Sequence, residues 1–334
     1  MKIALITPAG ARSRSGNRHT AMRWAEMLRS LGHKVHVSVS WDGRPADVMI
    51  ALHARRSHDS IIRFRERFPE SPLVVVLTGT DLYRDIRTDK DAKASLALAG
   101  RLVVLQDMGR LELPARFRRK TRVIYQSAEV HASPEPPSRR FRVAVIGHLR
   151  EEKDPFRAAL ALPHLRDLPE LEIVQLGEAL SPEMARTARR LARADARYRW
   201  LGNLPHWQAM RWLSRSHALV VSSRMEGGAN VICEAAAAGV PVIASRVSGN
   251  VGMLGRSHPG YYRLADERAL ARQMRRAGHD PDYYVRLKRS TAARRPLFRS
   301  AAEREGLRRL LAEVAPRPQS SRSSISRTGA KLRR

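Results

Sequence analysis

The chain has 334 residues, a length typical of two domains, and 43% of them are hydrophobic, which excludes a disordered protein. Lysine and arginine total 62 against 32 acidic residues, so the net charge is +30 and anionic partners are expected, either polyanions or small anions. One cysteine, Cys233, excludes a disulfide-stabilised fold and a thiolate-rich metal site.

The first predicted unit is a strand, a loop, a helix and a second strand. Ile3–Thr7 is a short apolar run, and a polar loop follows it over residues 11–18. Helical spacing of apolar residues covers Thr20–Leu31, with Gly32 in the position of a C-cap glycine, and valines alternate over Val35–Val39. This order predicts a βαβ unit whose first loop, at the carboxyl end of a strand, has room for a phosphate.

The alternation of strands and helices continues through the chain. Further strands are predicted at Val48–Leu52, Leu73–Leu77, Arg101–Leu105, Thr121–Ile124, Arg142–Ile146, Leu171–Leu176, Tyr198–Leu201, Ala218–Val221 and Val240–Ala244. Helices are predicted at Asp59–Phe68, Ala92–Ala99, Pro155–Leu162, Glu183–Ala194, Trp207–Leu213, Val231–Ala238 and Ser300–Val314. Such an order is typical of an α/β protein whose parallel sheets are covered on both faces.

A segment with three prolines, residues 132–140, is the predicted linker between two domains. We expect Rossmann-like domains over 1–131 and 141–295, a C-terminal helix within 296–314, and a disordered basic tail over 315–334, which has no acidic residue. The loops at the carboxyl ends of both sets of strands should face a central cleft between the domains.

No apolar run reaches the roughly 18 residues of a membrane span, and the apolar start of the chain is too short for a signal peptide. We therefore expect a cytoplasmic protein without stable membrane insertion. The stretch Ile61–Phe68 fits either a membrane-docking patch or a helix that faces the core.

The segment from Ser222 to Ala235 reads as a strand end, a glycine-containing loop and a helix, with Glu226 in the loop and Glu234 about two turns into the helix. The backbone amides of Gly227–Val231 are donors at a helix N-terminus, which suits a phosphate or a sugar hydroxyl. Glycine at 227 and 228 would let a ligand approach the backbone closely. The alternative is a simple turn in which Glu226 interacts with the helix dipole.

A second loop runs from Gly147 to Pro155 after the first strand of the C-terminal half. Arg150 and Lys153 in this loop can neutralise a diphosphate in the cleft. The alternative is a solvated charge run that Asp154 caps, with Pro155 at the first helical position.

Together these two segments resemble the retaining GT-B glycosyltransferases of family 4. The resemblance rests on two glutamates with seven residues between them, Glu226 and Glu234, on the alanine-rich helix that leads into Gly239–Ser245, and on the loop with Gly147, Leu149 and Lys153. His148 stands where the family usually has arginine, which leaves Arg150 as the alternative diphosphate contact.

The resemblance implies a UDP-sugar donor on the C-terminal domain and a reaction that needs no metal. Glu234 would hold the ribose, Lys153 with the amides of Asn230 and Val231 the diphosphate, and Glu226 with Gly227, Gly228 and Ala229 the sugar. Cations fixed beside the leaving diphosphate would stabilise the transition state. Two Asp-x-Asp motifs, at Asp89–Asp91 and Asp280–Asp282, do not directly follow strands and are not expected to bind metal; Asp280-Pro281 fits a helix start.

Loops at three strand ends of the N-terminal half should converge on the same cleft. They contain the candidate acceptor-binding residues Gly16, Asn17, Arg18, His53 and Thr80. Cationic Arg55 and Arg56 are neighbours of His53, and the set suits a small, doubly charged acceptor better than a sugar. The alternative is that Arg55 and Arg56 are the exposed start of a helix.

Several phrases of the N-terminal half, such as Ile50–Ser57 and Leu77–Tyr83, resemble one subgroup, the selenosugar synthases of selenoneine biosynthesis. This resemblance implies transfer of a hexose, typically N-acetylglucosamine, from a UDP-sugar to selenophosphate. Transfer to a hydroxyl acceptor is the alternative reaction, and nucleic-acid binding is the alternative of another class. A low aromatic content of 5% and a concentration of basic residues near the C-terminus disfavour nucleic acid.

Overall fold

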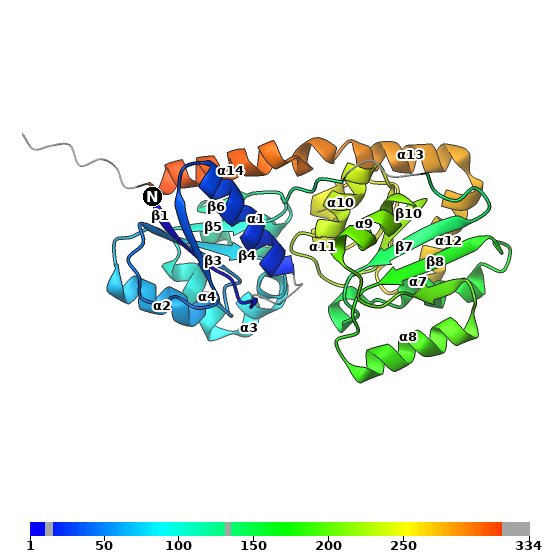
Figure 1. The fold of residues 1–334 in the computed structure, drawn as a ribbon, viewed down its shortest axis with the longest axis horizontal. Helices are drawn as coiled ribbons and strands as arrows, with labels where there is room; N and C mark the ends of the chain where they lie inside the picture. Colours follow the sequence, from blue (N-terminus) through cyan, green and yellow to red (C-terminus); the bar gives the residue numbers. More distant parts are fainter. Residues whose placement is uncertain (11–15, 131–134, 316–334) are drawn as a thin grey trace, which may run out of the picture.

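A computed structural model describes residues 1–10, 16–130 and 135–315. Two α/β domains lie side by side, each built on a six-stranded parallel sheet (Figure 1). The strand order is β2-β1-β3-β4-β5-β6 in the N-terminal domain and β12-β11-β10-β7-β8-β9 in the C-terminal domain. The predicted fold class, two Rossmann-like domains, is confirmed. The predicted loop over 11–18 and linker 132–140 lie partly outside the described residues, and the predicted tail lies almost wholly outside them.

The N-terminal sheet and its helices come from the first 123 residues. Their bounds are β1 Lys2–Ile6, α1 Gly16–Ser30, β2 Lys34–Ser38, β3 Val48–Leu52, α2 His58–Arg67, β4 Leu73–Leu77, the π-helical turn η1 Asp81–Asp85, α3 Ile86–Thr88, α4 Lys90–Leu98, β5 Arg101–Val104, α5 Gly109–Glu112, α6 Ala115–Arg118 and β6 Thr121–Val123.

The C-terminal sheet and its helices follow from residue 141. Their bounds are β7 Phe141–Ile146, η2 Glu151–Lys153, α7 Arg157–Ala161, η3 Leu162–His164, β8 Leu171–Leu176, α8 Pro182–Ala194, β9 Tyr198–Trp200, α9 His206–Ser214, β10 Ala218–Val221, α10 Asn230–Ala238, β11 Val242–Ser245, α11 Ser248–Leu254, β12 Tyr261–Tyr262, α12 Glu267–His279, α13 Pro281–Ala292, η4 Arg295–Phe298 and α14 Ser300–Val314.

The central strands of the N-terminal sheet are buried on both faces, which explains their unbroken apolar sequences. Side chains alternate along β3, so that Met49 and Ala51 pack on one face with Ile61 and Phe64 of α2. Ile50, from the other face of β3, belongs to the core that contains α1 and α14. Since Ile61 and Phe64 are fully buried, the stretch Ile61–Phe68 is a core-facing helix and not a membrane-docking patch.

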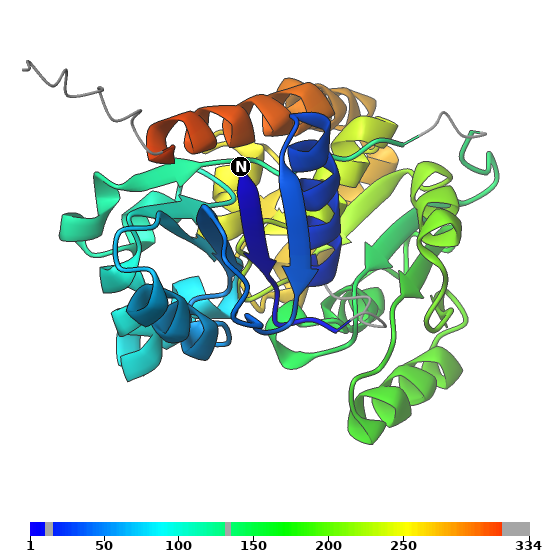
Figure 2. The same ribbon diagram turned by 60° about the vertical axis from the view of Figure 1, so that its left-hand side comes forward.

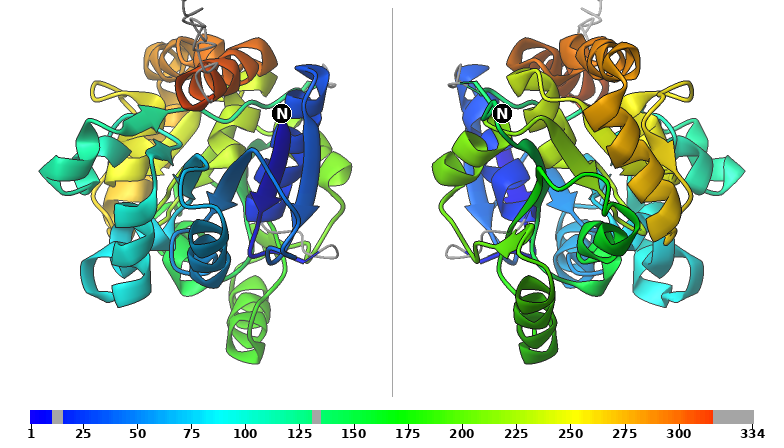
Figure 3. Two further views of the ribbon diagram at one scale, coloured as in Figure 1. Left: turned by 90° about the vertical axis from the view of Figure 1, so that its left-hand side faces the viewer. Right: turned by 90° about the vertical axis from the view of Figure 1, so that its right-hand side faces the viewer.

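The C-terminal helix returns to the first domain. From α13 in the C-terminal domain, the chain passes through η4 into α14, which runs along the same side of the molecule (Figures 1 and 3). Leu307, Leu310 and Leu311 of α14 are buried in the core that α14 and α1 form with one face of the N-terminal sheet. The upper part of α1 lies beside α14 (Figure 2). The predicted bounds of this helix are confirmed, but its packing partner could not be read from its own sequence.

A buried carboxylate ties α14 to the N-terminal domain. Glu303 is 1% exposed and accepts hydrogen bonds from Arg23 Nε (2.8 Å), Trp24 Nε1 (2.7 Å) and the backbone N of Ser127 (2.8 Å). Because Ser127 belongs to the segment that leaves the N-terminal sheet, this carboxylate joins α1, the crossover and the last helix.

Several helix starts differ from the sequence-based expectation, and two of them bear on the site. Helix α1 begins at Gly16, so Asn17 and Arg18 lie in its first turn and not in a loop. Helix α7 begins at Arg157 and not at Pro155, because Asp154 adopts a left-handed conformation with φ 43°. The Asp154 carboxylate pairs with Arg157 at 2.9 Å. At Asp280-Pro281 the expected helix start is confirmed, with Asp280 accepting from the backbone N of Tyr283 at 2.8 Å.

Replacing Glu303 with alanine should lower the free energy of unfolding by about 3 kcal/mol, because Arg23, Trp24 and Ser127 lose a shared buried acceptor. Urea denaturation followed by tryptophan fluorescence measures this loss. Glu305→Ala, on the exposed side of the same helix, is the matched control and should keep the wild-type midpoint. If the two variants unfold at the same urea concentration, the role assigned to Glu303 is wrong.

Candidate active site

A cavity of about 1220 Å³ lies between the domains, at the carboxyl ends of both sets of strands. Most of the predicted site residues line it: Gly16, Asn17, His53, Thr80, Gly147, His148, Arg150, Lys153, Glu226, Gly228, Ala229, Asn230, Val231 and Glu234. Two of them, Arg18 and Gly227, do not.

Lys153 and Glu226, predicted from separate motifs, contact each other. The Lys153 ammonium pairs with the Glu226 carboxylate, which is 7% exposed and also accepts from Ser223 Oγ at 2.5 Å. Ser222 Oγ donates to the backbone O of Asp154 at 2.8 Å, so the two loops are joined through the main chain as well. Lys153 is therefore not part of a solvated charge run.

Glycine at 227 and 228 is required by the other domain. A Cβ atom on Gly227 would lie 2.3 Å from the carbonyl O of Thr78, and one on Gly228 would lie 2.6 Å from Cβ of Leu105. Thr78 and Leu105 follow strands of the N-terminal sheet. The sequence-based interpretation, that these glycines admit a ligand, is wrong for Gly227, which the N-terminal backbone covers.

The N-terminus of helix α10 opens on the cavity. The helix begins at Asn230, and no side chain caps it at Ala229. The first amides of such a helix have no partner within it, and its dipole favours an anion there. The Gln126 amide bridges this loop to the N-terminal domain: in the orientation that satisfies its neighbours, its nitrogen donates to the backbone O of Gly228 (2.9 Å) and its oxygen accepts from Arg23 (3.2 Å).

Glu234 contacts a histidine that the sequence reasoning missed. His206 Nε2 lies 2.9 Å from Glu234 Oε1, and this hydrogen bond is the main cause that raises the pKa of His206. The ring of His19, on α1, lies 6.0 Å from that of His206 across the cavity, and burial lowers the pKa of His19. The position of His206 at a helix start directly after a strand-end loop was the signal that could have identified it.

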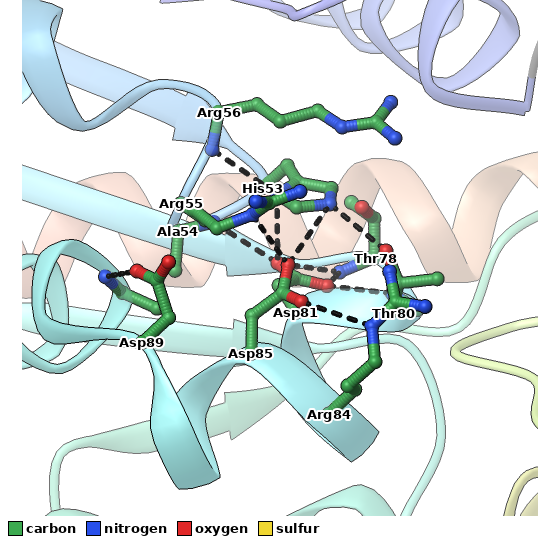
Figure 4. A network of polar contacts seen from close by, with 12 residues as sticks. His53, Ala54, Arg55, Arg56, Thr78, Thr80, Asp81, Arg84, Asp85 and Asp89 are labelled. Carbon is green, nitrogen blue, oxygen red and sulfur yellow. Dashed lines mark hydrogen bonds and ion pairs between the residues drawn. The ribbon is translucent and has the colours of Figure 1, made fainter.

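His53 is the centre of a polar network on the N-terminal side (Figure 4). Its backbone is in the left-handed region, with φ 73°, and burial is the main cause that lowers its pKa. Nδ1 accepts from the backbone N of Arg56 at 3.3 Å, so the ring proton belongs on Nε2, which lies 3.1 Å from Thr80 Oγ1. Thr80 therefore accepts from His53, and its own hydroxyl proton remains for a ligand.

Two aspartates support this network, and sequence reasoning did not identify them as site residues. Asp81 is fully buried and accepts from the backbone N atoms of Ala54 (3.0 Å), Thr78 (3.0 Å) and Gly79 (2.8 Å). Asp85 pairs with Arg55 at 3.0 Å and with Arg84 at 3.2 Å. Arg55 is thus held in an ion pair outside the cavity, whereas Arg56 lines the cavity.

Arg18 lies in the first turn of α1 and does not line the cavity, whereas Gly16, Asn17, His19, Thr20 and Arg23 of the same helix do. Arg23, which lines the cavity, takes the place that the sequence analysis gave to Arg18.

Over the part of the chain that the structure describes, no group of three or more histidine, cysteine, aspartate or glutamate side chains is arranged to hold a metal ion. Within the same residues, no helix combines the length and the apolar character that crossing a bilayer requires.

Gly227→Ala should push the domains apart at this contact and cost about 1–3 kcal/mol, because the added methyl group meets the Thr78 carbonyl. We expect a larger radius of gyration in small-angle X-ray scattering and a lower unfolding midpoint. Gly100→Ala is the matched control, since its Cβ would lie 3.7 Å from the nearest atom, an ordinary contact. An unchanged radius of gyration for Gly227→Ala would contradict the tight packing described here.

Solved structures of several glycosyltransferases share this fold. HepE from Anabaena, in complex with UDP and glucose, has a TM-score of 0.74 at 14% identity over 94% of this chain and 100% of that chain. Sucrose-phosphate synthase from Thermosynechococcus elongatus has a TM-score of 0.74 at 18% identity, over 94% and 98%. The pneumococcal O-GlcNAc transferase GtfA, with UDP and GlcNAc, has a TM-score of 0.65 at 16% identity, over 89% and 60%.

Sequence comparison identifies the family. Glycogen synthase of Mycobacterium tuberculosis is 33% identical over 105 residues, so the chain spans about a quarter (25%) of that relative's length, using 31% of its own. The sequence pattern of the family described as "Glycosyl transferases group 1" matches residues 126–294, which is 169 of the 334 residues. The chain therefore belongs to the group 1 glycosyl transferases, which are family 4 enzymes with the GT-B fold.

Proposed function

We propose that this enzyme transfers a hexose, N-acetylglucosamine in particular, from a UDP-sugar to selenophosphate and so forms a 1-seleno sugar. The observation that carries the proposal is the polarity of the N-terminal side of the cavity. In the loops after β3 and β4 the Asp81 and Asp85 carboxylates are buried and paired, and from these loops the Thr80 hydroxyl and the Arg56 guanidinium line the cavity. Glu26 and Glu129 line other parts of the same cavity. The Thr80 and Arg56 donors suit an anionic acceptor.

The donor side fits a nucleoside diphosphate. In this proposal Glu234 binds the ribose, Lys153 and the amides of Asn230 and Val231 bind the diphosphate, and Glu226 contacts the sugar. Gly228 and Ala229 complete the sugar site, because Gly227 lies behind them against the N-terminal domain. HepE, whose structure was solved with UDP-glucose, and GtfA, solved with UDP and GlcNAc, support a UDP-sugar.

The transfer breaks the bond between C1 and the diphosphate oxygen and forms a bond between C1 and selenium, so the immediate product is a sugar with selenium on C1 that still carries the phosphoryl group on selenium. The electron pair of the new bond comes from selenium, and the old pair leaves on UDP. Charge therefore grows on the diphosphate oxygens, where the Lys153 ammonium and the helix amides can stabilise it. Anionic selenium carries no proton to be removed, so no general base is needed, and His53 keeps its hydrogen bond to Thr80.

Mass spectrometry of the products from a panel of UDP-sugars, with and without selenophosphate, tests the proposal. We expect a selenium-containing sugar product from UDP-N-acetylglucosamine that depends on both substrates. If no UDP-sugar gives a selenium product while a hydroxyl acceptor is glycosylated, the proposed acceptor is wrong and the chain is a hydroxyl-directed family 4 enzyme.

Two substitutions should separate binding from catalysis on the donor side. Glu234→Ala should raise the donor KM by on the order of tenfold with little change in kcat, because the ribose contact is present in both ground and transition states. Lys153→Ala should lower kcat by on the order of a hundredfold, because its charge acts as the diphosphate leaves. Glu183→Ala, on the exposed start of α8, is the control. A collapse of kcat in Glu234→Ala at unchanged donor KM would contradict the assignment.

A further inference from the structure

Three arginines of the N-terminal domain line the cavity, and two of them are bound to other groups of the protein. Arg23 is held by Glu303 at 2.8 Å, and Arg29 donates to the backbone O of Val35 at 2.9 Å. Arg56 makes no ion pair and no side-chain hydrogen bond with any residue that the structure describes, although it lines the same cavity.

The turn at His53 separates Arg56 from its neighbour. With His53 in the left-handed region, the chain places Arg55 toward Asp85, which it meets at 3.0 Å. Figure 4 shows Arg56 extending on the other side of the His53 ring from Asp81 and Asp85. The backbone N of Arg56 donates to His53 Nδ1 at 3.3 Å, so the start of this side chain is fixed by a buried ring.

Among the arginines around this turn, Arg56 is the one with no carboxylate partner within the residues that the structure describes. Asp85 faces Arg55 and Arg84, Arg84 also faces Glu152 at 3.7 Å, and Asp81 is satisfied by backbone N–H groups. The Arg56 side chain and the Thr80 hydroxyl line the same cavity. A guanidinium binds two oxygens of a phosphate at once, and a hydroxyl can donate to a third or to the same group.

We infer that Arg56 binds the phosphate oxygens of the acceptor and, with Thr80 as a neutral second donor, makes this side of the cavity selective for a compact tetrahedral anion. The inference rests on the proposed function for the identity of the acceptor. Binding of the phosphate oxygens leaves selenium as the exposed nucleophilic atom. An uncharged hydroxyl acceptor can take a single hydrogen bond from Arg56, but it gains neither the charge pairing nor the two-oxygen contact that a phosphate gains.

Adjacent arginines give a matched test. Arg56→Ala should raise the KM for selenophosphate by on the order of 10- to 100-fold and leave the KM for the UDP-sugar within about twofold. Arg56→Lys keeps the positive charge but cannot bind two phosphate oxygens with paired N–H groups, so its KM for selenophosphate should lie between those of wild type and Arg56→Ala. Arg55→Ala removes the neighbouring arginine from the Asp85 pair and should change the selenophosphate KM less than threefold. Equal losses in Arg55→Ala and Arg56→Ala would overturn the inference.

A second measurement separates this inference from the proposed function. With UDP saturating the donor side, orthophosphate binding is followed by calorimetry in wild type and Arg56→Ala, and the affinity should fall by on the order of tenfold in the variant. If wild type makes no seleno sugar but binds orthophosphate through Arg56, the acceptor was misidentified and the anion site stands. If orthophosphate binds both proteins equally, or neither, the Arg56 site is wrong.

Discussion

The buried carboxylate of Asp81 holds the N-terminal side of the cavity together. It accepts hydrogen bonds from the backbone N atoms of Ala54, after β3, and of Thr78 and Gly79, after β4, so one side chain fixes two strand-end loops. Burying a carboxylate is unfavourable unless its lone pairs are satisfied, and three backbone donors achieve this without a cation. Because Asp81 takes no arginine, the cations of the neighbouring loop remain for Asp85 and for the cavity.

Sequence reasoning succeeded where the deciding interactions are local. Short apolar runs that alternate with helical segments predicted the parallel strands. The spacing of Glu226 and Glu234 predicted one cavity-lining loop and the helix after it. Tertiary contacts decided the rest. The prediction for Arg18 was wrong because the first turn of α1 is polar and shows no helical spacing of apolar residues. The prediction for Gly227 was wrong because no residue near it in the sequence indicates that it packs against the Thr78 carbonyl. The position of His206 at a helix start was a local signal, but its pairing with Glu234 of a different helix is a tertiary contact.

Polar groups near the cavity also connect the two domains. Gln126 connects the loop at Gly228 with Arg23, and Arg84 on η1 faces Glu152 at 3.7 Å, next to Lys153. In the proposed mechanism, the Arg84–Glu152 ion pair therefore connects the acceptor-binding network directly with the loop that binds the diphosphate. A ligand that moves either loop acts on a contact that the other loop shares.

The cavity also contains its own counter-ions for the donor side. Lys153 is neutralised by Glu226, and Glu234 is occupied by His206. In the proposed reaction a UDP-sugar has to exchange both internal pairs for contacts with itself. The same pairs can form again as UDP dissociates, so each acts as an intramolecular competitor that hastens product release. Turnover in such an enzyme benefits when the donor site binds UDP less tightly than its charged groups could bind it without these internal pairs.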